Sequence, residues 1–544
     1  MINCPLAGGR INPLAMTRED ISTHRDRLAL WVLPLLFTLA LVAARQASLP
    51  FWQAFNLDPD YYYLLNGLRM VEGLAPTDVS HPGTPVQLLI ALVLKAMHLG
   101  AAPGAIVDAV LDDPEGHLYA ATTVVYLLVG ASLWLMGRAV FAWGGLAPAL
   151  LAQAAPFLAR IIVKMALHPK PEPFLIVAVA GLAAASFAAA RAERAGDRHA
   201  LWAGVAMGFG IACKIHFVAL GVVPLLLFDR RRFLLYAAAT MLSFAAFFAP
   251  ALPSLDIWLD WLHRVVLGAG AYGEGARTVI DPGRYPRAVW RLFSAKWFYT
   301  GGMVLSLAML AAYFRLRRRG LVAPDRSARL LAGIVLGQFA TQLLIAKHPA
   351  PHYMVPALML TGPALAVLWR MSATILPPVG HRRAWAGLAL AAVVAGGIGT
   401  VRQIQELAGW TRDTQALPMA RFAGCAKVYF DAASAPSYAF LRGDMNAQAR
   451  YSPLLAKRFP ADEFTWFTND HTWWSHRLVQ WGRPVAMADI LAGHPCTVFR
   501  GNQYSLFESL MAGTAFDDKC AVGEEMLYTK GVTCDGRAIR PIAK

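Results

Sequence analysis

Long apolar runs alternate with short polar loops from Leu28 to Val401. A helix needs about 17–25 mostly apolar residues to cross a lipid bilayer. The pattern therefore predicts about eleven transmembrane helices. The predicted spans are Leu28–Ala44, Tyr119–Met136, Leu146–Met165, Phe174–Ala190, Leu201–Cys213, Phe217–Phe228, Phe233–Ala249, Trp297–Phe314, Leu330–Ala346, Tyr353–Trp369 and Ala384–Val401. The two short runs around Lys214 are also compatible with half-helices.

One apolar run, Pro85–Leu99, is too short to be counted as a crossing. The loop after it is acidic, and no Lys or Arg occurs between Lys95 and Arg138. Because cytoplasmic loops of membrane proteins are enriched in Lys and Arg, this loop is predicted to lie outside. We therefore expect Pro85–Leu99 to be an interfacial or re-entrant helix.

The segment just after the first span combines two carboxylates with a helix start. Asp58 is a favourable N-cap, Pro59 suits the first helical position, and Asp60 lies in the first turn. Apolar residues then recur on one helical face, which predicts a helix lying along the bilayer surface. The two carboxylates can act in chemistry, or they can serve only as a cap and as a complement to the helix dipole.

Beyond residue 401 the hydropathy falls and the pattern changes. Short runs at 426–430 and 496–499 are typical of strands, with helical segments between them. The chain is therefore predicted to be an all-α polytopic membrane domain, with juxtamembrane helices, followed by a small soluble α/β domain. The expected divisions are a cytoplasmic segment at 1–27, a transmembrane domain at 28–401 and an extracytoplasmic domain at 402–544.

The net charge of +16 comes mostly from Arg in short loops between apolar runs. Such a distribution indicates membrane topology, so no nucleic-acid partner is expected. The arginine-rich loops are predicted to face the cytoplasm, which places the N-terminus inside and the C-terminal domain outside. A composition rich in Ala and Arg favours a bacterial inner membrane.

Four of the six cysteines lie in the C-terminal portion, at Cys425, Cys496, Cys520 and Cys534. Four cysteines in an extracytoplasmic domain predict two disulfides, with three pairings open. Four buried free thiols are the alternative.

Lysine, in contrast to arginine, is confined to the outer half of the predicted membrane domain. An ionisable residue at membrane depth is costly and is a candidate for function. A compact ammonium group can hold a phosphate as a point charge. The candidate catalytic residues are Asp58 and Asp60, and the candidate substrate-binding residues are His81, Lys170, Glu172, Lys214, His216, Lys347, His352 and Tyr353.

Carboxylates and cations on one outer surface suit a group transfer from a phosphate ester. A carboxylate can act as general base on a hydroxyl, and cations can neutralise a departing phosphate. Nucleotide-sugars are absent outside the cytoplasm, so we expect a polyprenyl-phosphate sugar donor whose tail contacts the apolar helices. Besides lysines, Arg284, Arg287 and Arg291 of the long outer loop are candidates to hold the phosphate. The acceptor is left open among a glycan, a lipid and a protein.

Several short motifs resemble the GT-C superfamily of membrane glycosyltransferases. The nearer branch contains the protein O-mannosyltransferases and the lipid A aminoarabinose transferase. The resemblance rests on Asp58-Pro-Asp60, His81-Pro-Gly-Thr-Pro85, the Gly208–Lys214 segment, and Lys347 followed by His352-Tyr353-Met354-Val355-Pro356. It implies an inverting transfer with an outer-loop Asp as base. It also raises a divalent metal among Asp58, Asp60 and Glu172, which the sequence neither requires nor excludes.

Two rival functions predict different features. A lipid or glycan transporter without transferase activity would also place ionisable residues in the membrane. Transporters are commonly built from internal repeats, and the chain has no convincing repeat. A structural subunit would have no reason to segregate Lys from Arg across the membrane. The sequence therefore favours the transferase.

Overall fold

The structure is a computed structural model that describes residues 25–48, 50–53, 59–268, 277–294, 296–374, 377–468, 477–502 and 504–534. Within these ranges, eight helical segments are long and apolar enough to cross a membrane. They are Arg25–Ala47, Pro114–Gly144, Pro171–Arg191, Arg230–Leu267, Trp297–Arg318, Arg326–Ile345, Pro351–Ser372 and Pro378–Phe422. The prediction of a multi-pass, mainly helical membrane protein is confirmed.

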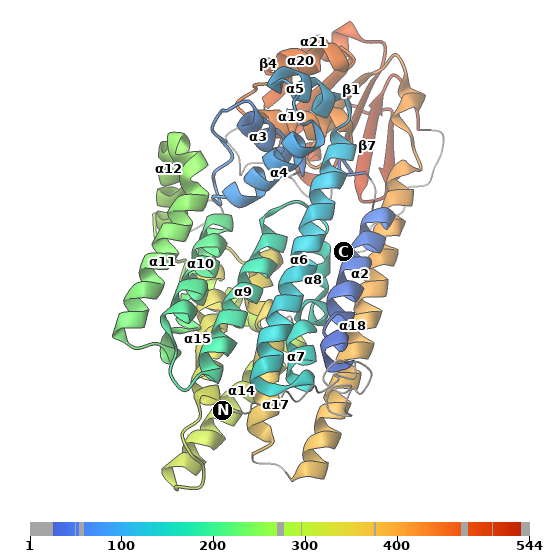
Figure 1. Ribbon diagram of the computed structural model, residues 1–544. Helices are drawn as coiled ribbons and strands as arrows, with labels where there is room; N and C mark the ends of the chain where they lie inside the picture. Colours follow the sequence, from blue (N-terminus) through green and yellow to red (C-terminus); the bar gives the residue numbers. More distant parts are fainter. Residues whose placement is uncertain are drawn as a thin grey trace, which may run out of the picture.

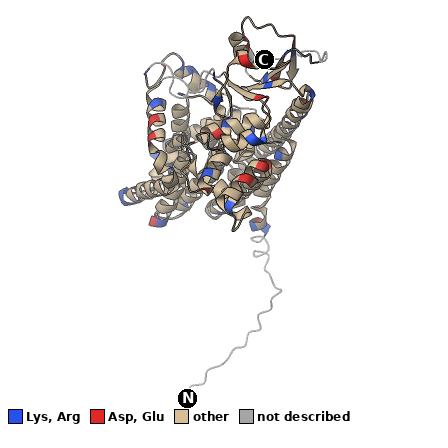
Figure 2. Cartoon of the chain, turned by 90° about the horizontal axis from the view of Figure 1, so that it is seen from above, with Lys and Arg blue, Asp and Glu red and all other residues tan. Residues whose placement is uncertain are grey.

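These segments lie side by side in an elongated bundle (Figure 1). Charged residues are sparse along the helices (Figure 2). The helices of the bundle are α2 (Val32–Ala47), α6 (Pro114–Gly144), α9 (Pro171–Arg191), α11 (Arg230–Phe248), α12 (Leu255–Leu267), α14 (Trp297–Arg318), α15 (Arg326–Ile345), α16 (Val355–Met359), α17 (Thr361–Ser372) and α18 (Pro378–Gln415). Short 3₁₀ turns η4 (Ala249–Ser254), η6 (Pro351–Met354) and η7 (Met419–Phe422) extend three of them.

Three of the eleven predicted spans are not among these eight long segments. The predicted Leu146–Met165 is divided into α7 (Leu146–Gln153), η1 (Ala155–Leu158) and α8 (Arg160–Ala166), because Ala159 is extended. The run up to Cys213 is α10 (Asp197–Cys213), and Lys214 after it is also extended. The run that follows forms only the 3₁₀ segments η2 (Ile215–Val222) and η3 (Leu225–Leu227). The half-helix alternative around Lys214 therefore describes this region better than two full spans.

Three short helices lie at the same end of the bundle as the C-terminal sheet (Figure 1). They are α3 (Tyr61–Val71), α4 (Thr84–Met97) and α5 (Pro103–Asp112). Helix α4 covers most of the predicted interfacial run, and its 14 residues are fewer than a crossing requires. Gly83, at φ 72°, turns the chain into α4, and Pro85 occupies its first turn. The predicted juxtamembrane helices are therefore present.

The C-terminal region forms one sheet of seven strands in the order β4-β3-β2-β1-β5-β7-β6. The central strands β2, β1 and β5 are parallel, with Val428 of β1 opposite Phe464 on one side and Phe499 on the other. All five residues of β1 are buried, as expected of a parallel strand covered on both faces. The strands are β1 (Ala426–Phe430), β2 (Glu463–Phe467), β3 (Arg477–Gln480), β4 (Arg483–Pro484), β5 (Thr497–Gly501), β6 (Asp518–Val522) and β7 (Glu525–Lys530).

Four helices accompany the sheet, which confirms the predicted small α/β unit. They are α19 (Pro436–Asn446), α20 (Ser452–Arg458), α21 (Met487–Gly493) and α22 (Tyr504–Leu510). The domain boundary at residue 402 stays a prediction, and α18 continues without a break across that position to Gln415.

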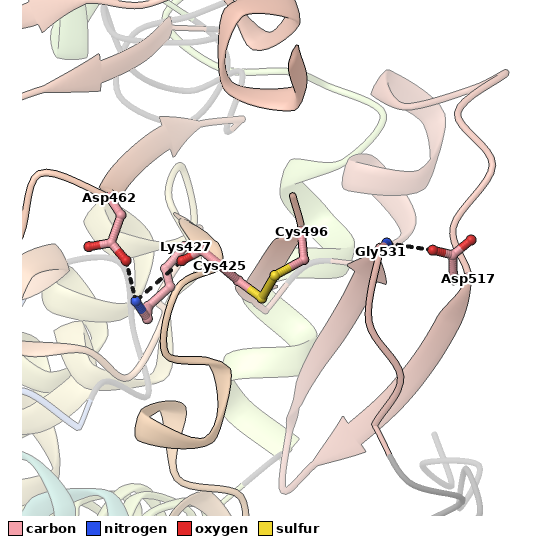
Figure 3. The surroundings of a disulfide bond; sticks show 6 residues. All are labelled: Cys425, Lys427, Asp462, Cys496, Asp517 and Gly531. Atoms are coloured by element: carbon pink, nitrogen blue, oxygen red, sulfur yellow. Dashed lines mark hydrogen bonds and ion pairs between the residues drawn. A yellow bond between two sulfur atoms is a disulfide. The ribbon is translucent and has the colours of Figure 1, made fainter. Parts of the chain in front are cut away.

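The four C-terminal cysteines form two disulfides, Cys425–Cys496 and Cys520–Cys534. The first joins the residues that precede the adjacent parallel strands β1 and β5 (Figure 3). Beside it, Lys427 Nζ lies 2.6 Å from Asp462 Oδ2 (Figure 3). This pairing selects one of the three connectivities left open by the sequence, and the alternative of four free thiols is wrong.

Helix α3 is held between α4 and the first helix of the C-terminal region, α19. Gly443 of α19 comes so close to α3 that a Cβ there would lie 2.8 Å from the carbonyl oxygen of Tyr61. Asn66 and Arg69 of α3 donate to the carbonyl oxygens of Asn446 and Ala447. The helix that follows Asp60 is therefore fixed by both the membrane domain and the C-terminal region.

Candidate active site

Asp60 immediately precedes α3 and is buried, with 2% of its surface exposed. Its Oδ2 accepts a hydrogen bond of 2.7 Å from Nδ1 of His168. Its Oδ1 lies 3.9 Å from Nζ of Lys170. His168 and Lys170 come from the turn between α8 and α9, so the predicted outer loop folds directly onto the predicted base.

Burial and charge act on Asp60 in opposite directions. Burial raises the pKa of the carboxyl group. The nearby His168 and Lys170, together with the hydrogen bond from His168, lower this pKa by more than burial raises it, so it lies below its ordinary value. Burial also lowers the pKa of His168. At neutral pH, Asp60 is thus a carboxylate that accepts a hydrogen bond from a neutral imidazole.

A second buried pair joins Glu172, in the first turn of α9, to Lys214. Nζ of Lys214 donates to Oε1 of Glu172 at 2.6 Å. The same ammonium lies 4.7 Å from the centroid of the Tyr353 ring. Lys214 is extended between α10 and η2, so the interrupted helix presents this side chain at the break. A buried ammonium that contacts both a carboxylate and an aromatic face has low solvation and strong electrostatic coupling.

The two pairs are neighbours along the chain. Lys170 contacts Asp60, and Glu172, two residues later, contacts Lys214. Two residues span at most about 7 Å. One short segment therefore connects the candidate base with the candidate phosphate-binding lysine.

The turn before α4 is bonded to the backbone at the same helix break. The amide of Ile215 donates to the carbonyl of His81 at 2.9 Å, and the amide of Gly83 donates to the carbonyl of Cys213 at 3.3 Å. The His81–Pro82 peptide is cis. The predicted His81 motif and the predicted Lys214 motif are thus parts of one local structure, although 133 residues separate them in the sequence.

A cavity of about 1280 Å³ opens beside Lys214. It is lined by residues of the His81 turn, the α10–η2 break, α12, α13 (Tyr285–Ser294) and the loop before η6. Six predicted binding residues line it, namely His81, Lys214, His216, Lys347, His352 and Tyr353. Arg284, Arg287 and Arg291 line it as well. Apolar side chains such as Trp261, Val265 and Leu344 complete the wall.

The remaining predicted site residues lie outside this lining. Asp60, Lys170 and Glu172 are buried and contribute no lining surface, and Glu172 contacts the cavity-lining Lys214. Lys347 lines the cavity, but its ammonium also donates to the carbonyl oxygen of Val266 at 2.5 Å. Asp58 lies outside the described residues. The site residues as a set stay predictions, now with a defined arrangement.

Two polar contacts at the site could not be predicted from the sequence. His168 belongs to the same His-Pro-Lys-Pro-Glu-Pro segment as Lys170, and only the fold shows that it contacts Asp60. Glu115 accepts a hydrogen bond from the hydroxyl of Tyr61 at 2.9 Å. In the sequence Glu115 is only one of several acids in the loop after Pro85–Leu99, and no motif links it to Tyr61, 54 positions earlier.

The described carboxylates do not fit the divalent metal that the resemblance raised. Each already faces a cation, Asp60 through Lys170 and Glu172 through Lys214. Divalent cations of the Ca²⁺ or Mg²⁺ type prefer several oxygen ligands around one position. The carboxylates and cations of the site are therefore considered as acid–base and phosphate-binding groups.

No family model and no curated protein sequence matches the chain. Among solved structures, it is similar to crystal structures of ArnT from Cupriavidus metallidurans bound to undecaprenyl phosphate and in the apo state. The first has 13% sequence identity and a TM-score of 0.43, and the second has 12% and 0.44. Each match covers 91% of this chain and 97% of the other.

Proposed function

We propose that this protein is an inverting glycosyltransferase that moves a sugar from a polyprenyl-phosphate donor to an acceptor hydroxyl. The observation that carries the proposal is the large cavity lined by cations, one of which, Lys214, pairs with the buried Glu172. Glu172 lies two residues from Lys170, which faces the buried carboxylate of Asp60. Perturbed ionisable groups gathered at a cavity are typical of active sites.

The cavity suits a lipid-linked phosphate. Lys214 and the three arginines of the α13 region supply positive charge on its wall. Arginine can bind a phosphate through two parallel hydrogen bonds, and lysine acts on it as a point charge. The apolar residues of α12 and α15 offer a surface for the first isoprene units. Such a site neutralises the charge that a departing phosphate acquires.

Asp60 is the described residue best placed to act as base, and Asp58 stays a second candidate. The Asp60 carboxylate takes the proton of the acceptor hydroxyl, and the hydroxyl oxygen forms a bond to the anomeric carbon. The bond from that carbon to the phosphate oxygen breaks on the opposite side, and the phosphate leaves with the bonding electrons. Attack from the face opposite the leaving group inverts the anomeric centre. Among the described residues, Oδ1 of Asp60 accepts no hydrogen bond, so it has a lone pair free for this proton.

We place the site and the C-terminal region outside the cytoplasm of a bacterial inner membrane. The disulfides favour an oxidising compartment. Helices α9, α11 and α14 have arginines at the ends away from the sheet, at Arg191, Arg230 and Arg318, in agreement with the positive-inside rule (Figure 1). A nascent glycan, a lipid or a protein hydroxyl can serve as acceptor on that face.

A transfer assay with the reconstituted full chain tests the proposal. The donor is a polyprenyl-phosphate sugar pool, and products are identified by mass spectrometry after incubation with an extract of envelope lipids and glycans. We expect Asp60→Asn to reduce turnover by about 10²–10⁴-fold, the usual contribution of a general base. Asp58→Asn is measured in parallel.

A matched control replaces Asp197, which pairs with Arg231 at the other end of the bundle. If Asp58→Asn and Asp60→Asn both keep wild-type turnover, the base assignment is wrong. Uptake of labelled lipid into vesicles with no covalent transfer would favour a transporter instead.

A further inference from the structure

Glu115, the second residue of α6, connects the two sides of the segment that leads to the candidate base. Its Oε2 accepts a hydrogen bond of 2.7 Å from the amide of Phe51. Its Oε1 accepts bonds of 3.3 Å from the amide of Trp52 and 2.9 Å from the hydroxyl of Tyr61. Phe51 and Trp52 follow α2, and Tyr61 is the first residue of α3. One carboxylate therefore joins the end of the first span to the residue next to Asp60.

The residues that contact Glu115 are themselves tightly held. The guanidinium of Arg45 lies 4.0 Å from the centroid of the Phe51 ring. The Tyr61 ring is fully buried and packs edge-on against Phe440 of α19, with 4.8 Å between centroids. Gly443 allows the α19 backbone to approach Tyr61 from the same side. Tyr61 is thus packed against α19 through its ring and backbone and bonded to Glu115 through its hydroxyl.

We infer that Glu115 is a positioning residue for the transfer reaction, which acts by fixing Tyr61 and through it the carboxylate of Asp60. This inference rests on the proposed function. Within the described part of the chain, Glu115 bonds to Phe51, Trp52 and Tyr61 and does not line the cavity, so its effect is on geometry. A misplacement of about 1 Å at a catalytic group can reduce the rate by about 10²-fold. Donor binding depends on the separate cavity residues and is expected to change little.

Helix stabilisation alone is the competing account of Glu115. An acidic residue in the first turn of a helix is favourable because of the helix dipole. On that account, loss of Glu115 lowers thermal stability and leaves kcat per folded molecule unchanged. Measurement of kcat and KM per folded molecule therefore distinguishes the two accounts. The positioning role predicts a lower kcat with the donor KM unchanged, and helix stabilisation predicts that both stay unchanged.

Glu72, at the other end of α3, is a matched control. Its carboxylate also accepts from a tyrosine hydroxyl, that of Tyr451, and from Arg450, both at 2.8 Å. It is remote in sequence from Asp60 but ties the same helix to its surroundings. Substitution of Glu72 is expected to reduce stability without a specific effect on turnover.

The experiment compares Glu115→Ala, Glu115→Gln, Tyr61→Phe and Glu72→Ala in the reconstituted full chain. We expect Glu115→Ala to lower kcat by about 10²-fold while the donor KM stays within about twofold. Glu115→Gln keeps one acceptor oxygen for Tyr61 and should recover part of that loss. Tyr61→Phe removes the hydroxyl bond through which Glu115 is inferred to act, so it should lower kcat to a similar extent. Glu72→Ala should retain kcat even where its Tm falls.

Amide hydrogen exchange supplies a readout that does not require turnover. The amides of Tyr63 and Leu64 donate to the carbonyl of Asp60. Their protection should decrease in Glu115→Ala and remain in Glu72→Ala. Equal losses of kcat in these two variants, in proportion to Tm, would overturn the positioning role.

Asp60→Asn distinguishes a failure of this inference from a failure of the proposed function. If Asp60→Asn is inactive while Glu115→Ala turns over normally, only the positioning role is wrong. If Asp60→Asn is fully active, the base assignment is wrong, and the positioning role is overturned with it. A wild-type chain without transfer activity overturns both.

Discussion

At the end of the bundle near the sheet, Lys170, Glu172 and Lys214 are respectively 5%, 2% and 4% exposed. At the opposite end, the side chains that pair Arg231 with Asp197 are 80% and 41% exposed. Both regions contain ion pairs of similar length, at 2.6 Å for Lys214–Glu172 and 2.9 Å for Arg231–Asp197. The difference is solvation, since the first pair is removed from water and the second is not.

Solvation determines what each pair can do. A buried ion pair is expensive to form, and its presence is weak support for a purely stabilising role. An exposed pair is screened and commonly contributes about 0–1 kcal/mol. The buried pair beside a cavity therefore supports the proposed chemistry, whereas the exposed arginines support the proposed topology. An ion pair of one positive and one negative side chain thus has a different interpretation at each end of the protein, according to its burial.

Removal of Lys214 should have the largest effect on both stability and activity of the changes considered at the two ends. Lys214→Met leaves Glu172 buried without its cation, and loss of one partner of a buried pair costs about 3–5 kcal/mol. It also removes the charge that we propose binds the phosphate, so transfer activity should fall below detection. Turnover and thermal unfolding of the detergent-solubilised chain measure the two effects.

The double variant Lys214→Met with Glu172→Gln separates stability from function. Replacement of both charges avoids an unpaired buried carboxylate, so most of the lost stability should return. Activity should not return, because the cation is still absent. Recovery of turnover in the double variant would show that Lys214 serves only to neutralise Glu172.

The arrangement of the buried pairs was only partly accessible from the sequence. The positions of Lys170, Lys214 and Lys347 relative to the predicted spans place them at one membrane level, because hydropathy fixes depth. Pairing is different, since the partners of Lys214 and Asp60 are 42 and 108 residues away. Hydrophobic periodicity carries no information on which of several residues at one depth meet laterally.

The backbone conformation at the Lys214 helix break was likewise only partly predictable from the sequence. Short apolar runs on either side indicated an interruption, but the extended Lys214 and the 3₁₀ course after it depend on the turn at His81. Likewise, the four C-terminal cysteines predicted an oxidised domain, while their pairing depended on the adjacency of β1 and β5. Local chemistry was predictable, and tertiary neighbours were not.

The disulfides add a covalent difference, because both of those in the described residues lie in the C-terminal region and cross-link the end of the protein that carries the sheet. Cys425→Ser with Cys496→Ser removes a link across 71 residues, and Cys520→Ser with Cys534→Ser removes one across 14. The chain-entropy model gives losses of about 4 and about 3 kcal/mol for loops of these sizes. The first double variant should therefore unfold at the lower denaturant concentration. Equal midpoints would indicate that loop length is not the controlling factor.

The pH dependence of transfer tests the environment of Asp60. Because its folded pKa lies below the ordinary value of 3.8, the base should stay ionised and kcat/KM should hold throughout the mildly acidic range. The same shift contributes stability that is present above pH 3.8 and is lost as the pH falls through the folded pKa. His168→Ala removes a stabilising hydrogen bond, while burial continues to raise the pKa. The acidic limb of the profile should therefore move to higher pH in this variant.

The smallest effect is expected at the other end of the bundle. Arg231→Ala removes a largely exposed partner of Asp197, and Arg232 lies 3.5 Å from the same carboxylate, so the local charge is still balanced. Surface substitutions away from buried networks commonly change stability by less than about 0.5 kcal/mol. Turnover and Tm should match those of the wild type. A clear loss of transfer in Arg231→Ala would mean that the end of the bundle away from the sheet takes part in the reaction, because neither packing nor a buried charge could account for it.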